Sequence, residues 1–338
     1  MKYSVLAALL FLSLACHQVT EYNTSEDSQV TFLRTDDFQV ESTMDVFQGG
    51  RTLVPRGNSL LYVICSDGVI HRINTEGMSV DTSYSIGASS GTGYSDATVA
   101  GNGNLYVLGP GSQVIEVDLS TCSVEDQFVP SPRVEAICSS PTEDRLYFVD
   151  DVEQVIGMIR TANNSTGFTS NLWYRPADIT IEPRGGRKII VVCDNDAGSI
   201  FGVWLDMSEV SRLLSHDAYS PASCVAAYGS DSCYAVGCPR WSGGGGYIKL
   251  VSGYVDPVQT EYHTVEGHPV DITSNSFGGT GQLCVLSRTD AGSTVVTVLE
   301  FPFSYLEPQV AATVELDGFP QDIACSANGE YIIILTTH

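Results

Sequence analysis

A unit of about 40–50 residues recurs along this chain, and that self-similarity restricts the fold more than any other feature. Each unit reads as an inner strand, a turn and further short strands, as in RTLVPRGNSLLYVICSDGVIHRIN from Arg51 and RPADITIEPRGGRKIIVVCDNDAGSIFGVWL from Arg175. Other units begin at Tyr94, Arg133, Ser220 and His268. A further unit, FPQDIACSANGEYIIILTTH from Phe319, contains only two strands.

Repeats of this length with four short strands each are typical of a β-propeller. Strands such as SQVIEVDL alternate apolar and polar residues, whereas KIIVV and YIIIL are almost continuously apolar. The second pattern indicates a sheet that lies between two neighbouring sheets. A single unit could not bury both of its faces, so we expect the units to pack side by side until they close a ring.

The two strands missing from the last unit are predicted at the other end of the repeat region. The segment Ser28 to Phe47 reads as two strands that belong to no unit of their own. Pairing these with the last unit would cover the exposed edges of both. The sequence therefore predicts an all-β, seven-bladed propeller over residues 28–338, one domain whose last blade is closed by N-terminal strands.

The run NLYVLGPGSQVIEVDLSTCSV resembles the YVTN-repeat, YncE-like family of exported propellers, whose units are similar to WD40 repeats. The resemblance extends from Arg51 to the end of the chain and is weakest at CPRWSGGGGYIKL and FPFSYLEPQV, which differ in length. It implies a propeller fold and export, and only loosely a binding function. The family shares no catalytic residues that could be transferred to this sequence.

The N-terminal stretch MKYSVLAALLFLSLACHQ predicts export followed by lipid attachment. One lysine precedes an apolar run from Val5 to Leu14, which suits a signal peptide over residues 1–15 and is too short to span a bilayer. LSLAC resembles a bacterial lipobox with Cys16 as the acylated residue, although Ser13 stands where leucine is preferred and would also suit ordinary cleavage after Ala15. Residues 16–27 read as a flexible tether.

The predicted location is the bacterial cell envelope, with the protein anchored to the membrane through the lipid. His17 rather than aspartate follows Cys16, which favours the outer membrane, on its periplasmic or its surface side. The formal net charge of -24, from 16 Lys and Arg against 40 Asp and Glu, makes nucleic acid a poor partner. An acidic surface keeps an exported protein soluble, and it could also attract cations or a basic partner.

Acidic residues recur just before the inner strand of most units, where the mouth of a propeller's central channel is expected. They are Asp96, Glu135, Asp178, Asp271 and Asp322. Thr52 and Ser223 take this place in the two remaining units. Converging carboxylates could hold Ca²⁺ or another divalent cation. Alternatively, each could accept hydrogen bonds from backbone N–H groups of its own strand or of the next blade.

Cysteine and tryptophan supply the other candidate sites. Nine cysteines remain after Cys16, an odd number, so at least one thiol stays unpaired within the chain. A disulfide between Cys224 and Cys238, across a predicted hairpin, is one option. Trp241, at the glycine-rich tip WSGGGG, is a candidate contact for a ligand and otherwise a packed cap. GASSG, Gly87 to Gly91, lies in a polar loop rather than the strand–turn–helix that a nucleophile elbow needs.

Two functions fit these observations. The favoured one is a non-catalytic binding or scaffold module at the cell envelope, with a protein or small-ligand partner and no catalytic residue or cofactor. The alternative is a divalent-metal-dependent hydrolase, similar to propeller lactonases, with the acidic ring as its metal site. Metal content would discriminate between them.

Overall fold

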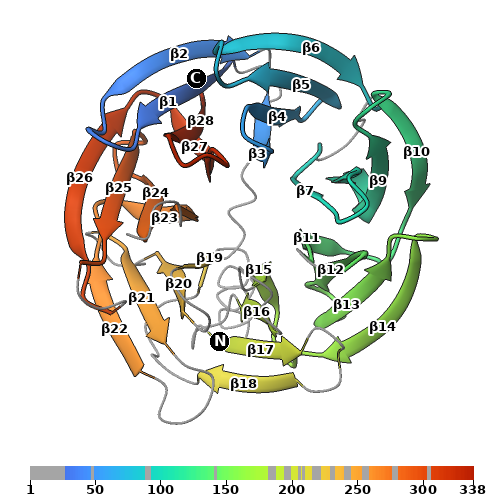
Figure 1. Cartoon of the computed structure of the whole chain (residues 1–338). Coiled ribbons are helices and arrows are strands. Elements are labelled where there is room, and N and C mark those ends of the chain that lie inside the picture. The colour runs from blue at the N-terminus through green and yellow to red at the C-terminus, as the bar shows by residue number, and fades with distance from the viewer. Residues whose placement is uncertain are drawn as a thin grey trace, which may run out of the picture.

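We describe the chain from a computed structural model, which covers residues 27–46, 49–87, 93–140, 143–181, 188–193, 199–204, 207, 210–214, 222–228, 233–239, 245–252, 259–275, 281–302 and 306–338. Within these residues, 28 strands form seven four-stranded antiparallel sheets. The sheets stand around a central axis as the blades of a propeller (Figure 1). The predicted seven-bladed fold is confirmed.

Blades 1 to 6 each consist of four consecutive strands, ordered from the axis outward. The strands are β3 (Gly50–Arg56), β4 (Leu60–Cys65), β5 (Val69–Asn74) and β6 (Ser79–Ser85); β7 (Asp96–Val99), β8 (Leu105–Gly109), β9 (Gln113–Asp118) and β10 (Ser123–Phe128); β11 (Val134–Ser139), β12 (Arg145–Asp150), β13 (Val155–Arg160) and β14 (Ser165–Asn171); β15 (Pro176–Ile181), β16 (Lys188–Cys193), β17 (Ile200–Trp204) and β18 (Val210–Leu214); β19 (Cys224–Ala227), β20 (Cys233–Cys238), β21 (Tyr247–Ser252) and β22 (Gln259–Thr264); β23 (His268–Asn275), β24 (Gln282–Arg288), β25 (Thr294–Glu300) and β26 (Gln309–Leu316).

Blade 7 joins the two ends of the propeller and closes the ring as predicted. Its inner strands are β27 (Phe319–Cys325) and β28 (Tyr331–Thr337), and its outer strands are β1 (Ser28–Arg34) and β2 (Val40–Val46). β1 pairs antiparallel with β28 over seven residues, from Ser28 opposite Thr337 to Arg34 opposite Tyr331. This pairing satisfies the edge of β28, which the repeat units alone would leave open.

Apolar side chains fill the spaces between neighbouring blades, and the described residues form one buried cluster at each of the seven interfaces. β28 shows why the sequence is so apolar there: Ile332 and Ile334 pack against blade 6, whereas Ile333 and Leu335 pack against blade 1. Side chains alternate along a strand, so a sheet buried on both faces needs apolar residues at every position.

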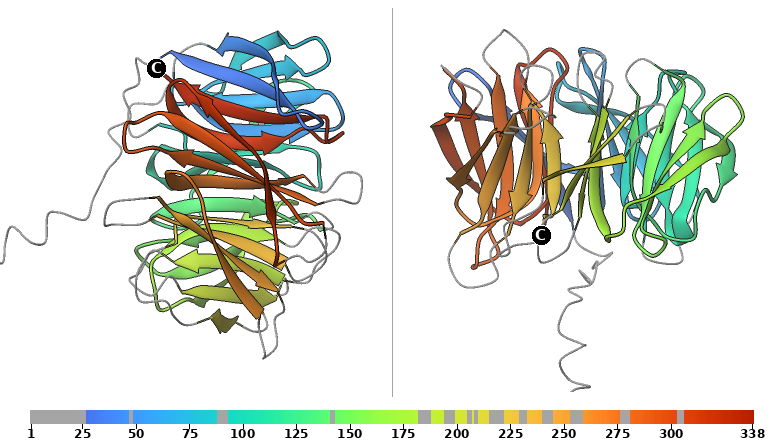
Figure 2. Two further views of the ribbon diagram at one scale, coloured as in Figure 1. Left: turned by 90° about the vertical axis from the view of Figure 1, so that its left-hand side faces the viewer. Right: turned by 90° about the horizontal axis from the view of Figure 1, so that it is seen from below.

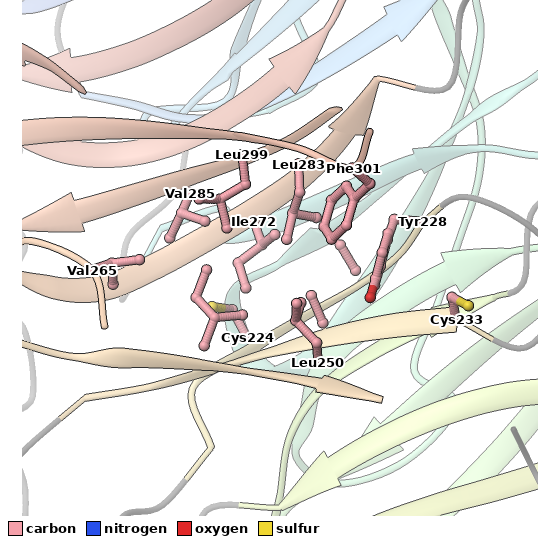
Figure 3. Close-up of a cluster of buried hydrophobic side chains, with 13 residues drawn as sticks. Cys224, Tyr228, Cys233, Leu250, Val265, Ile272, Leu283, Val285, Leu299 and Phe301 are labelled. Atoms are coloured by element: carbon pink, nitrogen blue, oxygen red, sulfur yellow. The ribbon is translucent and has the colours of Figure 1, made fainter. Parts of the chain in front are cut away.

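The interface between blades 5 and 6 illustrates the packing (Figure 3). Cys224 and Leu250 face it from blade 5, and Ile272 and Leu283 face it from blade 6. Tyr228 stacks on Phe301 at its edge, with ring centroids 4.8 Å apart. Side views show the blades standing face to face around the axis (Figure 2). The innermost strands therefore present one edge of every blade to the axis.

Candidate functional site

All five predicted acidic residues lie on innermost strands, and the four aspartates among them share one arrangement beside the axis of the ring. Asp96, Asp178, Asp271 and Asp322 belong to β7, β15, β23 and β27. Each is half-buried, since solvent reaches it from the axis. We refer to these four side chains as the axial aspartates.

Each axial aspartate first caps its own strand. One carboxylate oxygen, Oδ1, accepts a hydrogen bond from the backbone N–H of the following residue at 2.7 Å in all four cases. The repeated distance reflects a repeated backbone conformation at the start of the innermost strand. One of the two oxygens of each carboxylate is therefore bonded within its own blade.

The second oxygen reaches the next blade. Oδ2 of Asp96 accepts the N–H of Ile137 at 2.8 Å, and Oδ2 of Asp178 accepts the N–H of Val225 at 2.8 Å. In the same way, Oδ2 of Asp271 accepts the N–H of Ile323 at 3.2 Å. These bonds link blade 2 to blade 3, blade 4 to blade 5, and blade 6 to blade 7.

Asp322 makes the fourth such link, across the closure of the ring from blade 7 to blade 1. Its Oδ2 accepts the N–H of Leu53 at 2.6 Å and the hydroxyl of Thr52 at 2.7 Å. The axial aspartates thus connect neighbouring blades directly through main-chain donors.

Strand register corrects the set of equivalent positions that the sequence suggested. The innermost strands β11 and β15 each have a bulge near their start, so Ala136 lies opposite Val149 just as Asp178 lies opposite Val192. In blade 3, Ala136 and not Glu135 therefore occupies the position equivalent to the axial aspartates. Glu135 is the preceding residue, and its side chain is exposed. Both strands carry the bulge at the same place, so the third residue after Arg133 and the third residue after Arg175 are equivalent.

Blade 5 requires the same correction. Cys224, opposite Gly237, holds the axial position, and Ser223 precedes it. The hydroxyl of Ser223 donates to the carbonyl of Pro269 in blade 6 at 3.1 Å. This bond links blades 5 and 6, where the axial position lacks a carboxylate.

Burial changes the ionisation of the axial aspartates. Loss of hydration raises the pKa of Asp96 to about 6 and raises the pKa of Asp178 and Asp322 well above the ordinary value. The negative charge of Asp271 adds to the increase at all three, and Asp322 also hydrogen-bonds with the Asp271 side chain. Protons are therefore held near the axis at a pH where exposed carboxylates are ionised.

In the part of the chain that the structure describes, no group of three or more His, Cys, Asp or Glu side chains is arranged to hold a metal ion. What the axial carboxylates demonstrably do is accept backbone hydrogen bonds. This is the second of the two roles that the sequence left open, and it accounts for both oxygens of each carboxylate.

The disulfide considered between Cys224 and Cys238 is absent, and Cys224 is a free thiol. Cys224 packs between blades 5 and 6, whereas Cys238 packs between blades 4 and 5. This option does not occur because the two side chains point to opposite faces of blade 5. The predicted signal peptide, Cys16, residues 17–26 of the predicted tether and Trp241 lie outside the described residues.

A second candidate site, which the sequence analysis missed, lies on the face where the innermost strands begin. Asp151, whose side chain is 2% exposed, pairs with two arginines from neighbouring loops. Its Oδ1 lies 3.1 Å from Nε of Arg133, and its Oδ2 lies 3.0 Å from Nη2 of Arg175. The Arg133 side chain is 51% exposed. The Asp151 carboxylate is thus buried, whereas the side chains of Arg133 and Arg175 are partly exposed to solvent.

The neighbouring Asp150 explains why these loops hold their shape. Its fully buried carboxylate accepts the Ser131 hydroxyl at 2.6 Å and the N–H of Arg133 at 2.8 Å. The N–H groups of Val152 and Glu153 also donate to it, at 2.9 and 2.8 Å. These bonds lower the pKa of Asp150 despite its burial. The carboxylate therefore fixes the loop that presents Arg133 and Asp151.

Trp173 lies two residues before Arg175 in the chain, is 64% exposed, and has its ring 6.4 Å from that of Phe201 between centroids. Its φ of 60° lies in the left-handed region, which is rare for an aromatic residue. The side-chain oxygen of Asn171 accepts the N–H of Trp173 at 2.6 Å and holds this turn. We call Trp173, Arg133, Asp151 and Arg175 the arginine–tryptophan cluster. Its signal in the sequence was the arginine that precedes the inner strands of blades 3 and 4.

Comparison with known proteins supports the propeller fold and assigns neither a family nor a function. The sequence matches no protein-family model and no curated protein. Among solved structures, a chain described as Kuenenia stuttgartiensis hydrazine synthase superposes with a TM-score of 0.68 at 13% identity, covering 86% of this chain and 95% of that one. The chain therefore shares the β-propeller fold of this structure at low sequence identity.

Two further similarities come from different proteins. The WD40 repeats of RRP9 superpose with a TM-score of 0.66 at 10% identity, covering 92% of this chain and 98% of that chain. Dihydro-heme d1 dehydrogenase NirN superposes with a TM-score of 0.61 at 13% identity, over 90% of this chain and 68% of that one. Because these proteins differ in function, the shared fold alone assigns none. Over the described residues, no helix is long and apolar enough to cross a membrane.

Proposed function

We propose that this chain is an exported, lipid-anchored propeller of the bacterial cell envelope that binds a partner and catalyses no reaction. The signal-like N-terminus, the lipobox resemblance around Cys16 and the YVTN-repeat resemblance support export and anchoring. The propeller then acts as a rigid support for a binding surface, at the outer membrane in preference to the inner membrane.

The observation that carries the binding role is the arginine–tryptophan cluster. An indole that is 64% exposed sits on a left-handed backbone, and two partly exposed guanidinium groups lie on the same face. Tryptophan and arginine are the residues most enriched at the energetic centres of interfaces. Rare backbone conformations concentrate where function maintains them.

The chemistry of this cluster indicates the kind of partner. Asp150 and Asp151 are buried, so this face presents two guanidinium groups and an exposed indole, although the whole protein carries a net charge of -24. The matching partner is a protein segment with a carboxylate next to an apolar side chain. Arginine binds carboxylates through paired hydrogen bonds, and the indole supplies apolar contact area.

The metal-dependent hydrolase has less support. Its proposed ligands, the axial aspartates, already accept two backbone N–H groups each, from their own strand and from the next blade. A cation at the axis would compete with those donors for the same oxygens.

Affinity capture from a detergent-solubilised envelope fraction tests the binding role. Trp173→Ala and Arg175→Gln should each reduce recovery of the same captured protein at least tenfold, and raised salt should weaken its capture by the unmodified protein. Arg145→Gln is the matched control, because Arg145 pairs with Glu143 on the opposite face and should not matter. Equal recovery with all variants, at unchanged melting temperatures, contradicts the proposed surface.

A further inference from the structure

Two cysteines face each other across the interface between blades 6 and 7. Along β24, Leu283 and Val285 face blade 5, whereas Cys284 and Leu286 face blade 7. Along β27, Ala324 faces blade 1, whereas Ile323 and Cys325 face blade 6. The alternation of side chains in two strands therefore directs both thiols into one apolar layer.

The two thiols are in contact. Both side chains belong to the cluster between blades 6 and 7, and a side-chain hydrogen bond between them contributes to the raised pKa of Cys284. Cys284 is fully buried, Cys325 is half-buried, and neither forms a disulfide. We propose that Cys284 and Cys325 are a disulfide-forming pair, and that oxidation by a small-molecule or protein disulfide links blade 6 covalently to blade 7.

The difference in exposure gives the order of the exchange. Cys325, which solvent reaches, attacks the oxidant's disulfide as a thiolate, forms a mixed disulfide and releases one oxidant sulfur as a thiolate. Cys284 then attacks the Cys325 sulfur and displaces the second oxidant sulfur. The two cysteines lose two protons and two electrons in total, and the oxidant takes up both to become two thiols.

The position of the pair determines its effect. Cys284 and Cys325 lie 41 positions apart in the chain, so the bond would close a loop that includes β25 and β26. Closing such a loop reduces the entropy of the unfolded chain. It would also tie blade 6 to the blade that joins the two ends of the propeller, a second lock on the ring beside the pairing of β1 with β28.

Peptide mapping of the oxidised protein tests the proposal directly. The purified native protein is incubated with oxidised glutathione, its remaining thiols are alkylated, and it is digested without reduction. We expect one species in which the peptides of Cys284 and Cys325 are joined, two hydrogens lighter than their sum. Cys122, half-buried at the turn after β9, is the positive control for reaction with the oxidant. We expect it to form a mixed disulfide with glutathione and no disulfide with another cysteine of the chain. Cys325 found only as its glutathione adduct, or unmodified while Cys122 reacts, overturns the proposal.

Stability measurements provide a second readout. Oxidation should raise the melting temperature of the native protein by about 5 °C, by the scaling for a loop of this length in a chain of this size. Cys325→Ser and Cys325→Ala should remove that increase, and Cys122→Ser should keep it. An increase of the same size in the Cys325 variants would assign the effect to another bond and contradict the proposal. Cys325 is chosen for substitution because it is less buried than Cys284, so its variants are expected to fold.

Discussion

The carboxylate of Asp322, in the last blade, accepts the backbone N–H of Leu53, in the first blade, at 2.6 Å. The two residues are far apart in the chain and adjacent in the ring. Three other aspartates form the same kind of link between neighbouring blades. A residue type that the sequence offered as a cation ligand therefore acts as a connector between blades.

Removing the Asp322 side chain should weaken the closure of the ring. Asp322→Ala leaves the N–H of Leu53 and the Thr52 hydroxyl without this acceptor, while the N–H of Ile323 keeps Asp271. We expect a loss of about 2–3 kcal/mol in the free energy of unfolding, measured by urea denaturation. Asp36→Ala, at a side chain that is 78% exposed, is the control and should change it by less than about 0.5 kcal/mol. A loss no larger than in the control would contradict the connecting role.

Stability should depend on pH through Asp96. Burial raises its pKa to about 6 from an ordinary 3.8, so the folded protein binds this proton more tightly than the unfolded chain does. The stabilisation that comes from this proton is complete below about pH 4 and is lost as the pH rises through about 6. The melting temperature of the native protein relative to Asp96→Asn should therefore fall between pH 4 and pH 7.5. A difference that stays constant over this range would show that Asp96 titrates normally.

The N-terminal strands should contribute strongly to stability. Phe32 in β1 is fully buried between blades 7 and 1 and packs edge-on against Tyr331, with ring centroids 6.0 Å apart. Phe32→Ala should cost about 3–4 kcal/mol of unfolding free energy. Val40→Ala, in β2 with 47% exposure, should cost far less in the same assay. Similar losses would mean that β1 is not an integral part of the last blade.

Calcium should leave the melting temperature unchanged up to about 10 mM, because a ligand stabilises only by binding the native state. The expected reason is that the oxygens of Asp178 and Asp271 already accept backbone N–H groups. A rise that the double variant Asp178→Asn, Asp271→Asn abolishes would instead support the cation site and the hydrolase alternative.

Lipidation should be the only anchor. Cys16→Ser should move the protein from the membrane fraction to the soluble fraction of a cell lysate, since the acylated sulfur is lost. Immunoblots of the two fractions measure this. A variant that still sediments with the envelope would be held there by something other than the lipid.

The sequence by itself determined the fold class, the number of blades and the way the ring closes. The reason is that these features depend on local pattern: the alternating strands, the almost continuous apolar run YIIIL and the two extra strands near Ser28 are each visible within a few residues. It also singled out the four axial aspartates, three of which stand in the same short motif, Pro-x-Asp-Ile, as in Pro176 to Ile179 and Pro320 to Ile323.

Only the tertiary structure decided which residues meet. Whether Glu135 or Ala136 faces the axis depends on a bulge that shifts the register by one residue. The link from Asp322 to Leu53, the contact between Cys284 and Cys325, and the pairing of Asp151 with two arginines each join residues from different blades or loops. A repeat predicts what lies within one blade. Contacts between blades depend on how neighbouring sheets are placed against each other, and the packing of the whole ring sets that placement.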